Sequence, residues 1–211
     1  DRIRDVMTVA HELGHGIHQY LSRQVGYLQS HTPLTTAETA SVFGEMIVFH
    51  RLLEQESDPK VRLALLTGKI EDAFATAFRQ IVMTRFEQSL HNARREEGEL
   101  EAERIGELWI AANAPMHGDT VTLTDNYSHW WSYLPHFIHT PFYTYAYSFG
   151  ELLVLALYRL YEEQGAGFVP GYMEMLGKGG SVSPSELVAP LGVDINDPGF
   201  WNGGLSLLDE M

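Results

Sequence analysis

The segment His11-Glu12-Leu13-Gly14-His15 has the residue types and the spacing of a metal-dependent hydrolase. His11 and His15 are four residues apart, so on an α-helix they share a face and their imidazole nitrogens can bind one metal ion. Glu12 lies one position further round the helix, where its carboxylate can polarise a metal-bound water without binding the metal. The pattern H-E-x-x-H therefore predicts zinc hydrolase chemistry, with His11 and His15 as ligands and Glu12 as general base.

Chance occurrence is the main alternative for this segment. With 10 histidines in 211 residues, composition alone would produce H-E-x-x-H with a probability of roughly 3%. The flanking residues argue against two surface histidines, because apolar and small residues recur at helical spacing and predict an amphipathic helix with a buried face. These residues are Ile3, Met7, Ala10, Gly14, Ile17 and Leu21. Glycines at 14 and 16 weaken a helix, and are explained if another backbone or a substrate approaches closely.

A catalytic zinc site needs a third protein ligand while one position stays open for water. The chain contains no cysteine, so only His, Asp and Glu can complete the site. Glu38 and Glu45 are seven residues apart on one face of an otherwise apolar predicted helix, an unusual setting for carboxylates. Because two His and one Glu form a known zinc ligand set, Glu38 is the expected third ligand. Glu45 is expected to hold a liganding histidine by its other ring nitrogen, with a buried ion pair or a surface carboxylate as the alternative.

A second group of polar aromatic residues follows Pro135. Thr140 as N-cap and Pro141 at the first helical position predict a helix that reaches about Glu163. Histidines and tyrosines at the entrance of one helix are candidate donors to a developing oxyanion. An aromatic core with hydrogen-bonded hydroxyls explains the same spacing equally well. The residues are His136 and His139 before the expected helix, and Tyr143, Tyr145 and Tyr147 within it.

The remaining patterns predict a nearly all-α chain that forms a single domain over residues 1–211. No internal repeat and no useful strand alternation is found. Residues 113–133 are expected to be irregular, and their aromatic side chains either line a substrate groove or pack beneath a loop. The expected helices run from Ile3 to about Leu21, from Thr35 or Thr36 to about Glu56, from Pro59 to about Glu97 with a break near Thr67-Gly68, from Glu101 to about Ala112, and from Pro170, Pro184 and Pro198.

Composition excludes several classes of partner. The formal net charge of −14 disfavours nucleic acid, because phosphate contacts need basic patches. No run of eighteen apolar residues occurs, so no membrane span is expected. The absence of cysteine fits a reducing cytoplasm, which is the expected location.

With these residues in view, the chain resembles, from end to end, the zinc metallopeptidases of the oligoendopeptidase F and thimet oligopeptidase type. Residues 11–18 resemble the family's zinc helix, and residues 37–45 resemble the segment that carries its third ligand. Supporting matches are Arg79-Gln80 with Phe86-Glu87, His136 to Gly150, Gly179-Gly180-Ser181 and Gly192-Val193-Asp194. The resemblance implies a multi-helix zincin-type catalytic domain with one zinc ion, held by His11, His15 and Glu38, and with Glu12 as general base.

The resemblance also implies the substrate and its contacts. His136 and two tyrosines, Tyr143 and Tyr147 by helical facing, would bind the substrate and stabilise the tetrahedral intermediate. Substrates would be oligopeptides, cut at internal bonds. Family members carry a long region ahead of the zinc helix, so residues 1–211 would be the C-terminal catalytic portion of a longer oligopeptidase, with that region as its partner. Two alternatives stay open: a zinc carboxypeptidase with the same residues, and a zinc-binding helical module without catalytic activity.

Overall fold

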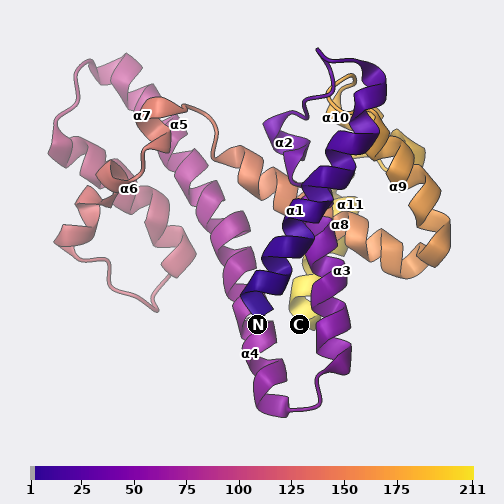
Figure 1. The fold of residues 1–211 in the computed structure, drawn as a ribbon. Helices are drawn as coiled ribbons and strands as arrows, with labels where there is room; N and C mark the ends of the chain where they lie inside the picture. The colour runs from indigo at the N-terminus through magenta and orange to yellow at the C-terminus, as the bar shows by residue number, and fades with distance from the viewer. Residues whose placement is uncertain (1–2) are drawn as a thin grey trace. The chain divides into compact units, whose positions relative to one another are not determined.

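The computed structural model describes residues 3–211, and throughout this range every regular element is a helix and none is a strand (Figure 1). The all-α expectation is thus confirmed. Residues 1 and 2, the first of the predicted domain, lie outside the described range. The α-helices are α1 (Ile3–Ser22), α2 (Leu34–Ala37), α3 (Thr39–Gln55), α4 (Pro59–Ala73), α5 (Arg79–Glu97), α6 (Ala102–His117), α7 (His136–His139), α8 (Tyr145–Gln164), α9 (Phe168–Gly177), α10 (Pro184–Val188) and α11 (Pro198–Glu210).

Shorter helical segments connect these elements. A π-helical segment, η2 (Phe74–Phe78), joins α4 to α5. The 3-10 segments are η1 (Arg23–Val25), η3 (Asp125–Tyr133), η4 (Gly165–Gly167) and η5 (Ala189–Leu191). The chain divides into two compact units, one made of Asp1–Asp72 with Phe149–Met211 and the other of Ala73–Ser148. The grouping of all 211 residues into one domain stays a prediction.

The core of the first unit is built around the apolar part of α8. Leu152 to Tyr158 form its longest apolar stretch, and most of these side chains are fully buried because other helices cover α8 on several sides. Phe43 of α3 lies among aromatic rings, with Tyr172 at 4.5 Å and Phe168 stacked at 5.7 Å between ring centroids. This core gives α3 a fixed place, and α3 in turn supports α1.

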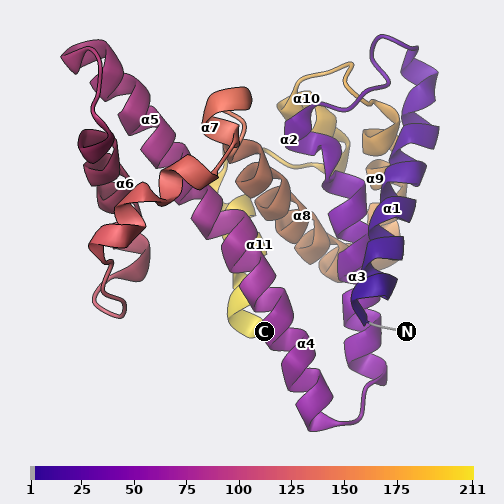
Figure 2. The same ribbon diagram turned by 60° about the vertical axis from the view of Figure 1, so that its left-hand side comes forward.

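Helix α1 lies beside α3 in both ribbon views (Figures 1 and 2). A Cβ atom at Gly14 would come within 2.4 Å of the Ala40 carbonyl oxygen, so glycine is required for this close approach. At Gly16 a Cβ atom would meet nothing within 4 Å. The close-backbone explanation therefore holds for Gly14 and does not apply to Gly16.

The buried face of α1 differs from the predicted one. Ile3 and Ile17 were expected inside and are 43% and 50% exposed, so that part of the prediction is wrong. The buried residues are instead Gly14, His18 and Ser22. Together with His11 and His15 they recur every three or four residues. The helix turns its small and polar stripe toward α3 because only that stripe permits close packing.

A matched pair of substitutions tests this packing. We expect Gly14→Ala to lower the free energy of unfolding by about 1–3 kcal/mol, because the added methyl group overlaps the backbone of α3. Gly16→Ala should be neutral or stabilise by up to about 1 kcal/mol, since alanine favours the helix and has free space. Urea unfolding of both variants provides the comparison. Equal loss of stability in the two variants would contradict the close α1–α3 contact.

His18 on the buried stripe should make stability depend on pH. Its Nδ1 has no hydrogen-bond partner in the described range, and burial, with a smaller contribution from His15, lowers its pKa from 6.5 to about 4. Because the folded pKa lies below the ordinary value, the unfolded chain takes up the proton first, and stability falls as the pH drops from 6.5 toward 4. Between pH 7.5 and pH 5 the loss should be about 2 kcal/mol.

The comparison is urea unfolding of the metal-free protein at these two pH values. His18→Leu should have a smaller loss than the parent protein, because the buried imidazole that must stay neutral is gone. An unchanged loss in His18→Leu would show that other groups cause the acid sensitivity.

Several helix ends differ from the predicted ones. The expected break at Thr67-Gly68 is wrong: α4 continues through it, and the Thr67 hydroxyl donates to the Leu63 carbonyl. The helix expected to end at Ala112 continues to His117, with Pro115 inside its last turn. The expected second helix is interrupted at Glu38, where the backbone leaves helical geometry between α2 and α3.

The second unit has its own aromatic core. Phe86 lies edge-on to Trp109 and Phe137, with ring centroids 5.1 Å and 5.0 Å apart. Within residues 113–133, Tyr127 and Trp131 pack against this core, whereas Trp130 and Tyr133 are 54% and 79% exposed. Packing beneath a loop therefore explains part of the aromatic stretch.

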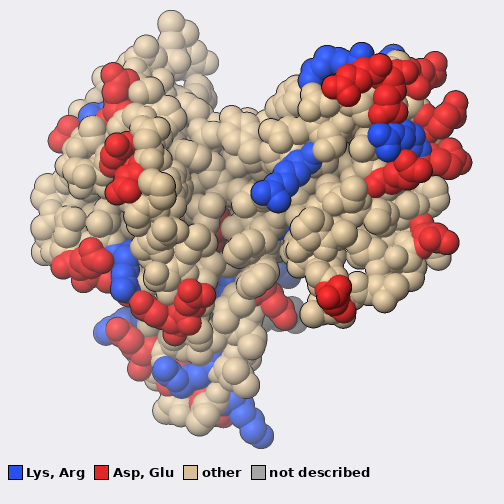
Figure 3. Space-filling view, turned by 180° about the vertical axis from the view of Figure 1, so that it is seen from behind, with Lys and Arg blue, Asp and Glu red and all other residues tan. Residues whose placement is uncertain are grey.

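On the face drawn in Figure 3, Lys and Arg side chains do not merge into a continuous basic patch. Across residues 3–211, no helix is both long and apolar enough to cross a membrane.

Candidate metal centre

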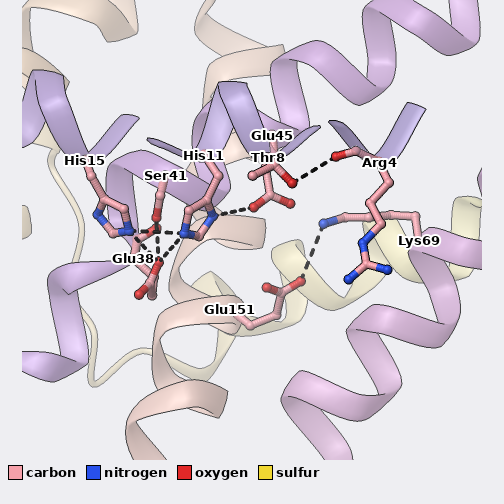
Figure 4. A network of polar contacts seen from close by, with 9 residues as sticks. All are labelled: Arg4, Thr8, His11, His15, Glu38, Ser41, Glu45, Lys69 and Glu151. Atoms are coloured by element: carbon pink, nitrogen blue, oxygen red, sulfur yellow. Dashed lines mark hydrogen bonds and ion pairs between the residues drawn. The ribbon is translucent and has the colours of Figure 1, made fainter. Parts of the chain in front are cut away.

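Three ligand-type side chains from α1 and the α2–α3 junction converge on one point (Figure 4). The Nε2 atoms of His11 and His15 are 3.1 Å apart. Glu38 Oε2 lies 3.4 Å from each of these nitrogens. The structure thus brings together the three residues predicted as metal ligands, although Glu38 is 23 positions beyond His15 in the sequence.

The spacing of these atoms fits a tetrahedral ion. Ligands at about 2.0–2.1 Å from zinc in a tetrahedron lie roughly 3.3–3.4 Å from one another. The observed separations of 3.1 and 3.4 Å match this value closely. The three side chains retain 29–39% of their exposure, so solvent reaches them. Two imidazoles and one carboxylate with access to solvent are the donor set of a catalytic zinc site.

Two further side chains on α3 orient the candidate ligands. Glu45 Oε1 lies 2.5 Å from His11 Nδ1. Because a carboxylate can only accept, the ring donates its Nδ1 proton to Glu45, which leaves the Nε2 lone pair free for a metal. The Ser41 hydroxyl donates to Glu38 Oε2 at 2.6 Å and holds that carboxylate in place. The contact of Glu45 is the one the sequence suggested. Ser41 was missed, and its only signal is a position three residues after Glu38.

Glu12 is exposed on α1, next in sequence to His11. Because it directly follows His11, its side chain lies one position further round the helix than the ligand face. Its exposure allows contact with water or substrate.

A buried ion pair lies near the centre and was not predicted. Lys69 Nζ is 4.0 Å from Glu151 Oε1, and both side chains are less than 10% exposed. Burial raises the pKa of Glu151, Lys69 opposes this shift, and Glu45 and Asp72 add to it. No sequence pattern joins two residues so far apart in the chain.

The second predicted group, His136 with the tyrosines that follow it, lies in the second unit. Tyr143 stacks on His136 with 5.6 Å between ring centroids and 4° between ring planes. The Tyr147 hydroxyl is 3.4 Å from His136 Nε2, and its ring lies edge-on to Tyr143 at 4.9 Å. Tyr145 is 49% exposed and is absent from these ring contacts. Of the three tyrosines, Tyr143 and Tyr147 are thus the two that contact His136, and their contact with substrate stays a prediction.

The prediction that a helix begins at Thr140 is wrong. His136 and His139 form the ends of the short helix α7, and α8 begins only at Tyr145. Phe142 takes a left-handed conformation with φ 60°, which ends helical geometry between the two elements. Tyr143 consequently reaches its partners from a turn.

Comparison with known proteins identifies the family of this chain. The model of peptidase family M3 matches residues 2–207. The chain belongs to peptidase family M3. Oligopeptidase PepF of Bacillus subtilis is 29% identical over the whole chain, which covers 31% of that protein. The plasmid-encoded oligoendopeptidase F of Lactococcus lactis subsp. cremoris is 28% identical, again over the whole chain, which covers 35% of it.

A solved structure extends the comparison with the M3 family to the fold. The crystal structure of oligoendopeptidase-F from Enterococcus faecium matches 99% of this chain with a TM-score of 0.85 and 27% identity. The match covers 38% of that protein. The fold is thus the helical, zincin-type fold of M3 peptidases. This chain spans about a third of the length of the curated relatives it matches.

Proposed function

We propose that this M3 family member is a zinc-dependent endopeptidase that hydrolyses internal peptide bonds of oligopeptides. The observation that carries the proposal is the convergence of His11 Nε2, His15 Nε2 and Glu38 Oε2 at mutual distances of 3.1–3.4 Å. The relatives named oligoendopeptidases support the same reaction class. A cytoplasmic location is part of the proposal.

The residues of the chain divide the chemistry among them. His11, His15 and Glu38 would hold one zinc ion, which when bound lowers the pKa of water to about 7 and polarises the peptide carbonyl. Glu12 accepts a proton from the attacking water and delivers it to the leaving amine. Glu45 keeps His11 in the tautomer with a free Nε2 lone pair, and Ser41 keeps Glu38 oriented.

His136, Tyr143 and Tyr147 are proposed to bind the peptide and to stabilise the oxyanion of the tetrahedral intermediate. The Tyr147 hydroxyl and the His136 ring nitrogen are close enough to share one acceptor. One such donor is typically worth about 3 kcal/mol of transition-state stabilisation.

A further region of polypeptide is proposed to complete the enzyme. The curated relatives are about three times as long as this chain. Helix α1 and its neighbours leave an apolar groove whose lining includes the exposed side chains of Leu13, Ile17, Ile47, Val169 and Met173. Exposed apolar patches of this kind mark surfaces that other protein segments cover.

Two measurements test the proposal. Zinc analysis of the purified protein should give one ion per chain. Mass spectrometry of digested oligopeptides should show cuts at internal bonds. Stepwise release of single C-terminal residues would instead assign the site to a carboxypeptidase. If the protein at its full natural length binds one zinc ion and cleaves no peptide, the zinc-binding module without catalytic activity would be the correct interpretation.

A further inference from the structure

The turn that carries Tyr143 has an unfavourable backbone conformation. Among the described residues, Phe142 is the one non-glycine residue with a positive φ, at 60°. A residue with a Cβ atom is disfavoured in this region, so the surrounding structure must hold it there. The turn lies between α7, which bears His136, and α8, which bears Tyr147. Whatever fixes Phe142 therefore fixes the relative positions of the three aromatic side chains.

The structure supplies such a contact from α5. The Phe142 backbone N–H donates to Glu87 Oε1 at 2.7 Å. Glu87 is only 1% exposed, and no lysine or arginine in the described range forms an ion pair with it. The nearest cation-type group is His91 Nε2 at 3.9 Å, and the His91 ring also lies 4.7 Å from the Phe142 ring. A buried carboxylate is costly unless it is hydrogen-bonded, so this backbone bond is the evident use of Glu87.

Neighbouring residues on the same helical segment hold the rest of the turn. The Thr84 hydroxyl lies 3.1 Å from that of Thr144, and Thr84 is three residues before Glu87 on the same face of α5. One turn into α8, the Ser148 hydroxyl donates to the Ala77 carbonyl at 2.8 Å. Glu87 thus supplies the one charged contact in a set of bonds that ties the turn to η2 and α5.

We propose that Glu87 is a positioning residue: its carboxylate holds the strained turn at Phe142 and thereby places Tyr143 and Tyr147 against His136 for substrate. The inference rests on the proposed substrate role of these three residues. Glu87 acts through the Phe142 backbone and needs no contact with the peptide itself.

Four variants test this role at the protein's full natural length. Glu87→Ala removes the acceptor, and Glu87→Gln keeps an oxygen that can accept the same bond without the charge. Glu87→Ala combined with Phe142→Gly removes the acceptor and also the strain, because glycine adopts positive φ readily. Glu96→Ala, an exposed carboxylate on the same helix, is the control. The readouts are amide exchange at residue 142 by NMR, and kcat and KM for an oligopeptide.

We expect Glu87→Ala to speed exchange of the Phe142 amide and to lower kcat/KM by about 10- to 100-fold, the size of effect that a displaced binding group causes. Glu87→Gln should fall between this variant and the parent protein. Phe142→Gly should restore much of the loss in the Glu87→Ala background. A purely structural role would lower thermal stability without such rescue, because a glycine at 142 cannot repair a general loss of packing.

Unchanged exchange at residue 142 in Glu87→Ala, or failure of Phe142→Gly to rescue, would overturn the proposal. The exchange measurement needs no activity, so it separates this proposal from the proposed function. If Glu87→Ala speeds exchange while neither it nor Tyr147→Phe changes kcat/KM, the hold on the turn is supported. The same result would show the substrate role of the tyrosines to be wrong.

Discussion

Glu12→Gln is expected to lower kcat for peptide hydrolysis by about 10²–10⁴-fold, the usual contribution of a general base. The amide that replaces the carboxylate has nearly the same shape but cannot accept a proton from water at neutral pH. Because Glu12 is exposed and outside the set of converging ligand atoms, the zinc content should stay at that of the parent protein. Steady-state kinetics on an oligopeptide, with metal analysis of the same sample, measures both quantities.

A matched control is available two helical turns away on the same helix. Asp5→Asn makes the same chemical change on α1, seven residues before Glu12 and therefore on the same side of the helix. It should leave kcat within about twofold, because an exposed charge at that distance contributes little through solvent. Substantial hydrolysis by zinc-loaded Glu12→Gln would show that another group takes the proton.

The ligand residues could be predicted from the sequence because their chemistry is encoded locally. A spacing of four residues places His11 and His15 together on any helix, whatever packs against it. Glu38 needed a further argument, since the closeness of α1 and α3 depends on Gly14 and on small residues that face it. The carboxylate was nevertheless recognisable, because an acidic residue in an apolar helix needs a reason.

The positions of side chains that depend on contacts between distant segments could not be predicted. Hydrophobic periodicity assigned Ile17 to the buried face of α1, whereas close backbone packing selected the stripe with Gly14 and His18. Likewise Thr140-Pro141 is a good local start for a helix. The left-handed Phe142 overrides it because Glu87, 55 residues earlier, accepts its N–H. Local helix propensity cannot predict a hydrogen bond between residues so far apart in the sequence.

Removal of Glu38 is expected to have the largest effect on metal binding. An apparent zinc-binding free energy of about 10–16 kcal/mol, shared among four ligands, assigns about 2.5–4 kcal/mol to each. Glu38→Ala should therefore raise the zinc Kd by roughly 10²–10³-fold. Glu45→Gln should raise it by about 10- to 100-fold, because Glu45 acts only through the His11 ring. Competition with a chelator of known affinity gives these values.

The order of the effects separates a ligand from its supports. Ser41→Ala should change the Kd least of the three, since the Glu38 carboxylate keeps its place on the chain and loses one hydrogen bond. Glu54→Ala, on the exposed side of α3, should leave the Kd unchanged because its ion pair with Arg51 is a surface one. A Kd for Glu38→Ala equal to that of Glu54→Ala would remove Glu38 from the ligand set. A larger loss with Glu45→Gln than with Glu38→Ala would instead assign the third ligand to Glu45, which the 2.5 Å contact with His11 Nδ1 argues against.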